Sequence, residues 1–318
     1  ELDLQREVLV CSPCGRRTVI DAGTLRNGTI LCLDCRAEES LADNSARRDG
    51  PPNWRLFAQQ YLVRHGPGPR QVDRLYKRAT KDDRQKFREA ADQLQKIESE
   101  GKLVTPDREI PAEGRSDSRP VLHGFERYTD LFNDRQLLHL HHLAEELNGW
   151  EYSPERRAFV LAFSEHLTTN NMLVGYAFGY ERTSPLFSIQ SFRHITRPVE
   201  VNPWLHRIGR GTYPNAVLKV GRAVDAAAAP TDPLPCGGKR VGDAAVGTGQ
   251  PVSKELEDAK TQNVVTARSS EDLNEVPVDS VDLVLTDPPY GDNVNYSELS
   301  DFYLAWHQVL DVAPGEYA

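Results

Sequence analysis

Apolar residues recur with helical spacing in three parts of the chain, at residues 133–147, 154–170 and 297–310. The first part begins with Asn133 and Gln136, which have the form of a capping box. Its apolar face is made by Leu137, Leu140, Leu143, Ala144 and Leu147. We therefore predict three helices, of which the second is the more apolar.

A helical pattern also runs across residues 54–104, with a break at Gly66-Pro67-Gly68-Pro69. The piece after the break, about residues 71–101, is mostly charged, and its apolar residues are too sparse for a deep core. We expect a solvated, basic helical arm at this place.

Strand signals lie toward the two ends of the chain. Residues 1–40 are short and β-like, and Asn27-Gly28 between two short runs predicts a hairpin turn. Residues 264–265 and 281–285 have the composition of strands, and a predicted helix follows them. Strands and a helix separated by loops are typical of a parallel α/β sheet, so we predict an α/β fold for this part.

Segments rich in Pro, Gly and polar residues divide the chain into parts. Residues 41–53 and 105–120 have the composition of linkers, and residues 220–246 are rich in Ala, Gly and Pro. The predicted parts are a β-like unit at 1–40, a basic helical arm with linkers at 41–120, a helical region at 121–219, an irregular linker at 220–260 and the α/β part at 261–318.

Composition places the chain among globular proteins. It has 318 residues, of which 39% are hydrophobic and 27% charged, so it is neither disordered nor fibrous in type. Its longest apolar stretch, about residues 158–163, is too short for a membrane span, and no secretory signal is visible. We expect a cytoplasmic protein. The first residue is not Met, and we expect the chain to be a piece of something larger.

The charge of the chain is unevenly spread. The net charge is −9, which argues against a protein that coats nucleic acid non-specifically. Residues 54–88 nevertheless hold ten basic and three acidic residues. A basic surface that contacts DNA phosphates and a charge-rich solvated helix are equally compatible with this stretch.

Four cysteines near the start have the spacing of a zinc site. Cys11-x2-Cys14 and Cys32-x2-Cys35 are separated by seventeen residues, as in two-knuckle tetrahedral sites. A metal ion would join two turns that so short a ribbon cannot hold by apolar burial. Disulfides and unconnected thiols are the alternatives, and disulfides need an oxidising compartment. We predict structural zinc, because four thiolates leave no open position for water.

The loop Asp287-Pro288-Pro289-Tyr290 follows an apolar run and has the residues needed to activate an exocyclic amine. Asp287 can accept one N–H of the amine and the carbonyl of Pro288 the other, which frees the nitrogen lone pair. Pro289 helps to fix that carbonyl, and Tyr290 can stack on a base taken out of its helix. The alternative is a rigid turn in which the Asp is a local cap.

This loop resembles motif IV of S-adenosylmethionine-dependent amino-methyltransferases. Residues 281–303 closely resemble the adenine-specific DNA methylases that contain a zinc ribbon. The ribbon itself, residues 128–138 and residues 200–204 are also similar to that family. The resemblance implies part of a Rossmann-like methyltransferase sheet with the ribbon and a helical insertion, S-adenosylmethionine as cofactor, DNA as partner and a setting such as restriction–modification. It implies that Asp287, Pro288, Pro289 and Tyr290 are catalytic.

The chain departs from that family at the cofactor loop. The family's Gly-rich loop of the Asp-Pro-Phe-x-Gly-x-Gly type lies upstream of the ribbon, and this chain has none there. We expect a truncated enzyme, or one subunit whose partner, a second polypeptide, supplies the loop. Ser269 and Ser270 sit where the family has a loop next to the cofactor, and they could line its pocket or form an ordinary turn.

The sequence thus favours an N6-adenine DNA methyltransferase or a part of one. An RNA base methyltransferase, a cytosine-N4 methyltransferase and a non-catalytic zinc-containing module that binds DNA or a partner remain alternatives. His139, His141 and His142 invite a second metal site, but no HExxH pattern accompanies them. We expect them on an exposed helix face.

Overall fold

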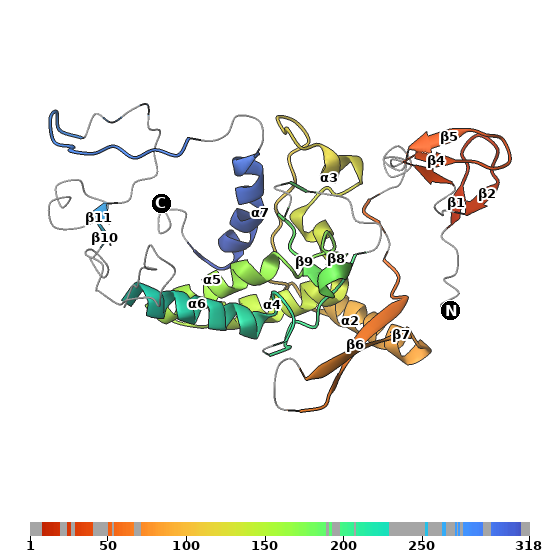
Figure 1. Ribbon diagram of the computed structural model, residues 1–318, viewed down its shortest axis with the longest axis horizontal. Coiled ribbons are helices and arrows are strands. Elements are labelled where there is room, and N and C mark those ends of the chain that lie inside the picture. The colour runs from red at the N-terminus through yellow and green to blue at the C-terminus, as the bar shows by residue number, and fades with distance from the viewer. Residues whose placement is uncertain are drawn as a thin grey trace, which may run out of the picture.

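The computed structural model of the chain has a body of helices and several small sheets (Figure 1). The residues that it describes are 8–19, 24–26, 29–40, 50–52, 54–66, 71–188, 191–192, 198–206, 208–228, 252–253, 263–264, 271, 273, 276–288 and 294–312.

The amino-terminal part is a ribbon of short antiparallel strands. Strand β1 (Val8–Val10) pairs with β2 (Arg17–Val19). A second sheet has the order β3 (Leu25–Arg26), β4 (Thr29–Leu31) and β5 (Glu38–Ser40). The pairing of Leu25 with Ile30 and of Arg26 with Thr29 confirms the hairpin predicted around Asn27-Gly28.

Residues 58–78 form a β-hairpin, so the helix predicted across this stretch is wrong. Strand β6 (Ala58–Arg64) pairs with β7 (Val72–Arg78) over seven residue pairs. The break at Gly66–Pro69 stands between the strands rather than between helices, and the Tyr, Leu and Val residues on both sides suit a pleated strand. The helical prediction is confirmed only for α2 (Lys81–Ser99), where Thr80 and Asp83 form a capping box.

The helical body contains the three predicted helices. They are α4 (Asp134–Asn148), α5 (Pro154–Leu167) and α7 (Tyr296–Val309), and Asn133 and Gln136 make the predicted capping box of α4. The body is completed by α3 (Arg119–Leu122), η1 (Tyr128–Leu131), β8 (Gly175–Ala177), η2 (Phe178–Tyr180) and β9 (Arg182–Ser184).

Helix α6 (Tyr213–Ala228) packs along α5 and corrects a further prediction. The sequence analysis assigns residues 220–246 to an irregular segment, but residues 220–228 are helical. Alanine is the best helix former, and three of the last residues of α6 are alanines, so composition alone misleads here. The remaining residues of that segment lie outside the described ones.

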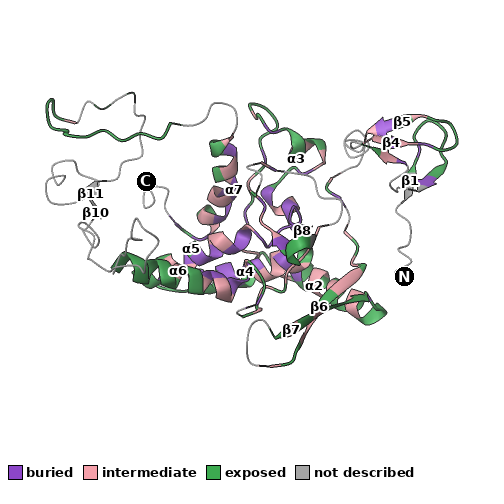
Figure 2. Cartoon of the chain, viewed as in Figure 1, coloured by how far each residue is buried: buried purple, intermediate pink, exposed green. Residues whose placement is uncertain are grey.

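The hydrophobic core lies where α4, α5 and α7 meet (Figure 2). Trp306 of α7 is fully buried, and its ring centre lies 5.5 Å from those of both Phe132 and Phe163. Other large side chains that are fully buried belong to Tyr128, Phe125, Phe192 and Phe302. The helix that follows the Asp287–Tyr290 loop is therefore anchored in the core.

The predicted parallel sheet has only a small counterpart in the described residues. Strands β10 (Val252–Ser253) and β11 (Asn263–Val264) pair in parallel over two residues each. Residues 281–285 are not a strand, and their apolar side chains are exposed, from 54% at Val281 to 84% at Leu285. An apolar strand of this type needs neighbours on both faces, and none of the described segments supplies them. The Rossmann-like sheet stays a prediction.

Candidate functional site

The four cysteines converge on one point between the two sheets of the ribbon. Their Sγ atoms all lie within 4.8 Å of one another. The Sγ atoms of Cys11 and Cys35 are 3.5 Å apart, and those of Cys14 and Cys32 are 3.7 Å apart. Tetrahedral zinc with Zn–S bonds of about 2.3 Å needs S–S separations of about 3.8 Å. The cluster can therefore hold a metal ion, and its dimensions are compatible with zinc.

The two knuckles have the same backbone geometry. In each, the first cysteine donates its N–H five residues ahead, at 2.8 Å from Cys11 to Arg16 and at 2.8 Å from Cys32 to Ala37. The fifth residue of each turn has a positive φ, at Gly15 (φ 70°) and Arg36 (φ 61°). Sequences 21 residues apart thus build two equal halves of one site.

Hydrogen bonds and burial change the pKa values of the thiols in opposite directions. The backbone N–H of Cys35 and the hydroxyl of Thr18 lower the pKa of Cys32 to about 6. Burial raises the pKa of Cys11 to about 12. A divalent cation would offset that burial cost, because a coordinated thiol is deprotonated. The donor set therefore fits a cation better than it fits four free thiols.

A second group of possible ligands, His141, His142 and Glu145, has a hydrogen bond that opposes metal binding. His141 is buried and accepts the backbone N–H of Val104 at Nδ1, over 3.1 Å. A neutral imidazole that accepts at Nδ1 carries its proton on Nε2, so the nitrogen near Glu145 has no lone pair for a metal. The prediction that His139, His141 and His142 lie on an exposed helix face is right only for His142, because His141 is buried and His139 is half-buried.

The structure describes only half of the predicted amine-binding loop. Asp287 and Pro288 are exposed, and no hydrogen bond or ion pair joins Asp287 to another described residue. Pro289 and Tyr290 lie outside the described residues, as do Ser269 and Ser270. The structure thus brings the four cysteines together, and it places Asp287 and Pro288, the other predicted site residues that it describes, in exposed positions.

Two segments singled out by the resemblance lie against each other. From residues 128–138, Arg135 donates two hydrogen bonds to the carboxylate of Glu200, which belongs to residues 200–204. Asn133 donates a third bond to Glu200, at 3.0 Å from Nδ2 to Oε2. This contact gives the second segment a physical role that its sequence does not disclose.

A pair of histidines lies beside that contact. The Nε2 atoms of His139 and His166 are 3.1 Å apart, and Nδ1 of His166 donates to the carbonyl of Gly211 at 2.6 Å. Burial lowers the pKa of both rings, which keeps them neutral at neutral pH. His166 therefore accepts a hydrogen bond at Nε2 from His139. Trp204 and Tyr213 pack on the pair edge-to-face. The sequence analysis misses His166, whose only signal is its place on the apolar helix 154–167.

The helix after the loop is held by a buried carboxylate. Glu298, in the first turn of α7, accepts the backbone N–H groups of Ser116 and Asp117, at 2.6 and 3.3 Å. It also pairs with Arg115 at 2.9 Å, and both side chains are at least nine-tenths buried. Glu298 therefore fixes the amino-terminal end of α7 to the loop at residues 115–117.

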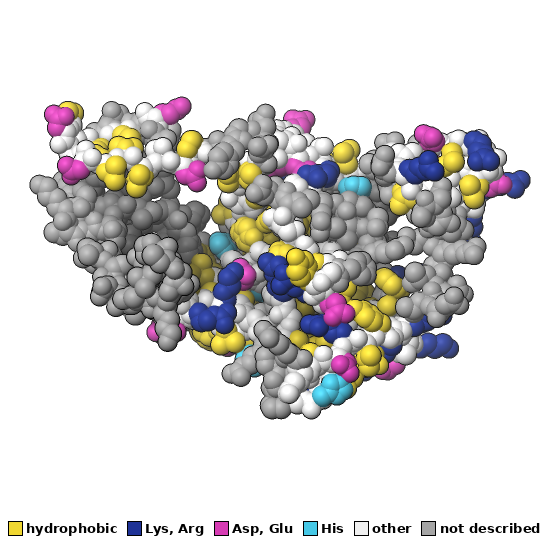
Figure 3. Space-filling view, in the orientation of Figure 1, with side chains coloured by type: hydrophobic (Ala, Val, Ile, Leu, Met, Phe, Trp, Pro, Cys, Tyr) yellow, Lys and Arg dark blue, Asp and Glu magenta, His cyan; other side chains and the backbone are white. Residues whose placement is uncertain are grey.

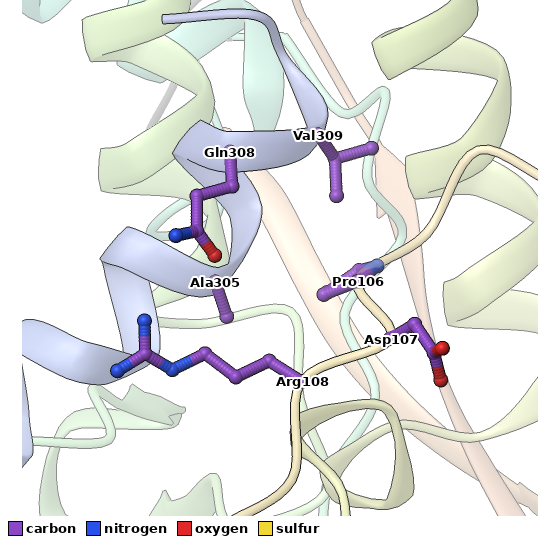
Figure 4. Close-up of a pocket in the computed structure, with 6 residues that line it drawn as sticks. All are labelled: Pro106, Asp107, Arg108, Ala305, Gln308 and Val309. Carbon is purple, nitrogen blue, oxygen red and sulfur yellow. The ribbon is translucent and has the colours of Figure 1, made fainter. Parts of the chain in front are cut away.

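The described surface also has an open cavity of about 490 Å³ beside α7 (Figure 4). Arg108 lines it, but Nη2 of this residue is bound to Asp301 at 2.8 Å. The cavity is lined by Pro106, Asp107, Arg108, Ala305, Gln308 and Val309. None of the predicted site residues lines it, so we assign it no role.

Comparisons of the chain with protein-family models, with curated proteins and with solved structures found no match. Among the described helices, none combines the length and the apolar character needed to cross a bilayer.

Proposed function

We propose that this chain is an S-adenosylmethionine-dependent methyltransferase, or the part of one that binds the target amine, and that it acts on N6 of adenine in DNA. The observation that carries the proposal is the contact between Arg135 and Glu200. Two segments that resemble the zinc-ribbon DNA methylases meet there, and α7, which belongs to the third, packs on the same core.

In this proposal the loop acts as an acceptor of hydrogen bonds. Asp287 takes one N–H of the adenine amine, and the Pro288 carbonyl takes the other. Both acceptors then draw the nitrogen toward tetrahedral geometry, and Tyr290 stacks on the flipped base. S-adenosylmethionine would supply the methyl group. Within the described residues, no cleft joins Asp287 to a place for that cofactor.

The ribbon would hold one structural zinc ion through Cys11, Cys14, Cys32 and Cys35. The support is the near-tetrahedral spacing of their sulfur atoms. Four thiolates fill the coordination sphere, so the ion would have no position for substrate. Its role would be to hold the two knuckles together.

The experiment is transfer of a tritiated methyl group from S-adenosylmethionine to mixed-sequence duplex DNA, with and without a candidate second polypeptide. Asp287→Ala should abolish transfer. Asp282→Ala removes the same charge from a neighbouring exposed position and should leave transfer intact. Equal rates for Asp287→Ala and the unaltered chain would refute the role of Asp287. Competitor RNA tests the alternative of an RNA base methyltransferase. Competitor DNA with methylated cytosines tests the alternative of a cytosine-N4 methyltransferase.

The exposure of Asp287 favours a second candidate, a non-catalytic zinc-containing module that binds DNA or a partner. A catalytic carboxylate usually lies in a cleft that excludes water. Absence of S-adenosylmethionine binding by calorimetry, even with the second polypeptide, would support this module over the enzyme.

A further inference from the structure

Strands β6 and β7 and helix α2 form one unit, here called the ribbon–helix arm and made of residues 58–66 and 71–99. The turn between strand and helix is fixed by the Thr80 cap and by an ion pair of 3.2 Å between Lys77 and Asp83. The arm is also fixed to the body, because the Arg135 guanidinium lies 5.0 Å from the Phe87 ring centre. A ligand on this arm would therefore be held in a set place relative to the core.

The hairpin of the arm is only partly covered by the body. Gln60 and Tyr76 are hydrogen-bonded to the hydroxyl of Tyr176, at 2.7 and 2.8 Å, and Arg74 pairs with Glu181 at 3.2 Å. Among its fourteen paired residues, none is buried on either face. Tyr61 is 42% exposed and Tyr76 is 53% exposed. A two-stranded hairpin with no buried residue is marginally stable in water, so its partly exposed surface suggests a face that a partner covers.

Basic residues follow one side of α2, the helix that comes directly after the hairpin. Lys81, Arg84 and Arg88 recur at i, i+3 and i+7, which places them on one stripe of the helix. None of the three forms an ion pair with another described residue. Figure 3 shows Lys and Arg side chains over this region of the molecule. The arm itself holds nine Lys and Arg residues against six Asp and Glu residues, in a chain of net charge −9.

We propose that the ribbon–helix arm is the docking element for duplex DNA. The inference rests on the proposed function and names the part of the chain that would hold the substrate. The stripe of Lys81, Arg84 and Arg88 matches the phosphate backbone in charge. The hairpin has the form that the major groove of B-DNA admits, since a groove about 12 Å wide accepts a two-stranded ribbon. An acidic protein partner would match the charge of the arm, but it would not require the partly exposed hairpin.

The test is binding of the full chain to a fluorescent mixed-sequence DNA duplex, measured by anisotropy over a series of salt concentrations without cofactor. The triple variant Lys81→Gln, Arg84→Gln, Arg88→Gln should bind more weakly. Its plot of log affinity against log salt should be less steep by about 2.7, since each phosphate contact contributes about 0.9. The matched control Arg157→Gln, Lys219→Gln, Arg222→Gln removes the same charge from exposed positions outside the arm and should keep the original slope.

An unchanged slope in the first variant, or an equal change in the control, would overturn the docking role. Equal competition by duplex RNA would overturn the groove assignment, because the major groove of A-form RNA is too narrow for side chains. Circular dichroism of both variants checks that they fold. Binding does not require methyl transfer, so the two proposals can fail separately. A chain without transfer activity that binds DNA through the arm supports this inference and not the proposed function.

Discussion

Arg135 and Glu200, which are 65 residues apart in the sequence, form two parallel hydrogen bonds of 2.7 Å from Nε to Oε1 and 2.9 Å from Nη2 to Oε2. A planar guanidinium and a carboxylate match each other in this geometry, which makes the contact specific as well as attractive. It joins the start of α4 to the segment that leads into α6. Because both partners are partly buried, water screens the pair less than it screens a surface pair.

Replacing Glu200 with Gln should lower the free energy of unfolding by about 1–2 kcal/mol, since charge-assisted hydrogen bonds to Arg135 and Asn133 weaken. Urea unfolding measures this. The control is Glu165→Gln, which breaks an exposed pair with Lys219 and should cost about 0.5 kcal/mol or less. A cost no larger than that of the control would show that the contact does not stabilise the body.

Replacing Glu298 with Gln should lower the free energy of unfolding by about 3 kcal/mol, because Arg115 would keep a buried charge without its partner. Asp301→Asn, three residues further along, changes a partly exposed pair with Arg108 and should lower the free energy of unfolding by about 1 kcal/mol or less. Thermal unfolding of the two variants compares them directly. Equal costs would contradict the role of Glu298 as the anchor of α7.

Acid should destabilise the body through the histidine pair. Burial lowers the pKa of His139 to about 3 and that of His166 to about 4, from 6.5 in the unfolded chain. The unfolded state therefore binds more protons below pH 6.5, and stability falls as the pH drops from 6.5 toward 4. Each histidine contributes a slope of at most about 1.4 kcal/mol per pH unit.

This dependence is measured as the melting temperature across that pH range. The double variant His139→Gln, His166→Gln should reduce the slope, and His142→Gln, which changes an exposed ring, should not. Burial also lowers the pKa values of His141 and His307, so part of the slope should remain. An identical slope in the double variant would exclude the pair as its source.

Gly211 should not tolerate a side chain. Its φ is +71°, and a Cβ atom placed on it would lie 1.8 Å from Oγ1 of Thr169. Gly211→Ala should therefore cost about 1–3 kcal/mol and disturb the carbonyl that binds His166. Gly221→Ala on the open side of α6 meets no atom within 4 Å and should stabilise by up to about 1 kcal/mol. Denaturant unfolding should give a lower free energy of unfolding for Gly211→Ala and a higher one for Gly221→Ala than for the unaltered chain.

Removal of metal should loosen the cysteine-bearing ribbon at the amino-terminal end and leave the helical core folded. The purified chain should carry one equivalent of zinc, and Cys14→Ser should lose most of it, as measured by elemental analysis. Chelation should make the ribbon sensitive to proteolysis without lowering the helical dichroism, because the buried core residues of α4, α5 and α7 lie outside the ribbon. Well under half an equivalent in unchelated protein would contradict the zinc proposal.

Local patterns predict the elements that depend on local interactions. The capping box at Asn133 and Gln136 and the hairpin at residues 25–30 are confirmed, because caps and tight turns are decided within a few residues. The predicted cysteine cluster is confirmed for the same reason, since each knuckle is a turn between Cys residues three apart.

The sequence by itself determined the main helices, the turns and the convergence of the four cysteines. The tertiary structure decided that residues 58–78 are strands, that His139 meets His166 and that Arg135 binds Glu200. These features depend on partners that lie far away along the chain, and a strand or a buried polar group is stable only when such partners are present. The exposed segment at residues 281–285 shows the converse, since a strand pattern without a neighbouring strand forms no sheet.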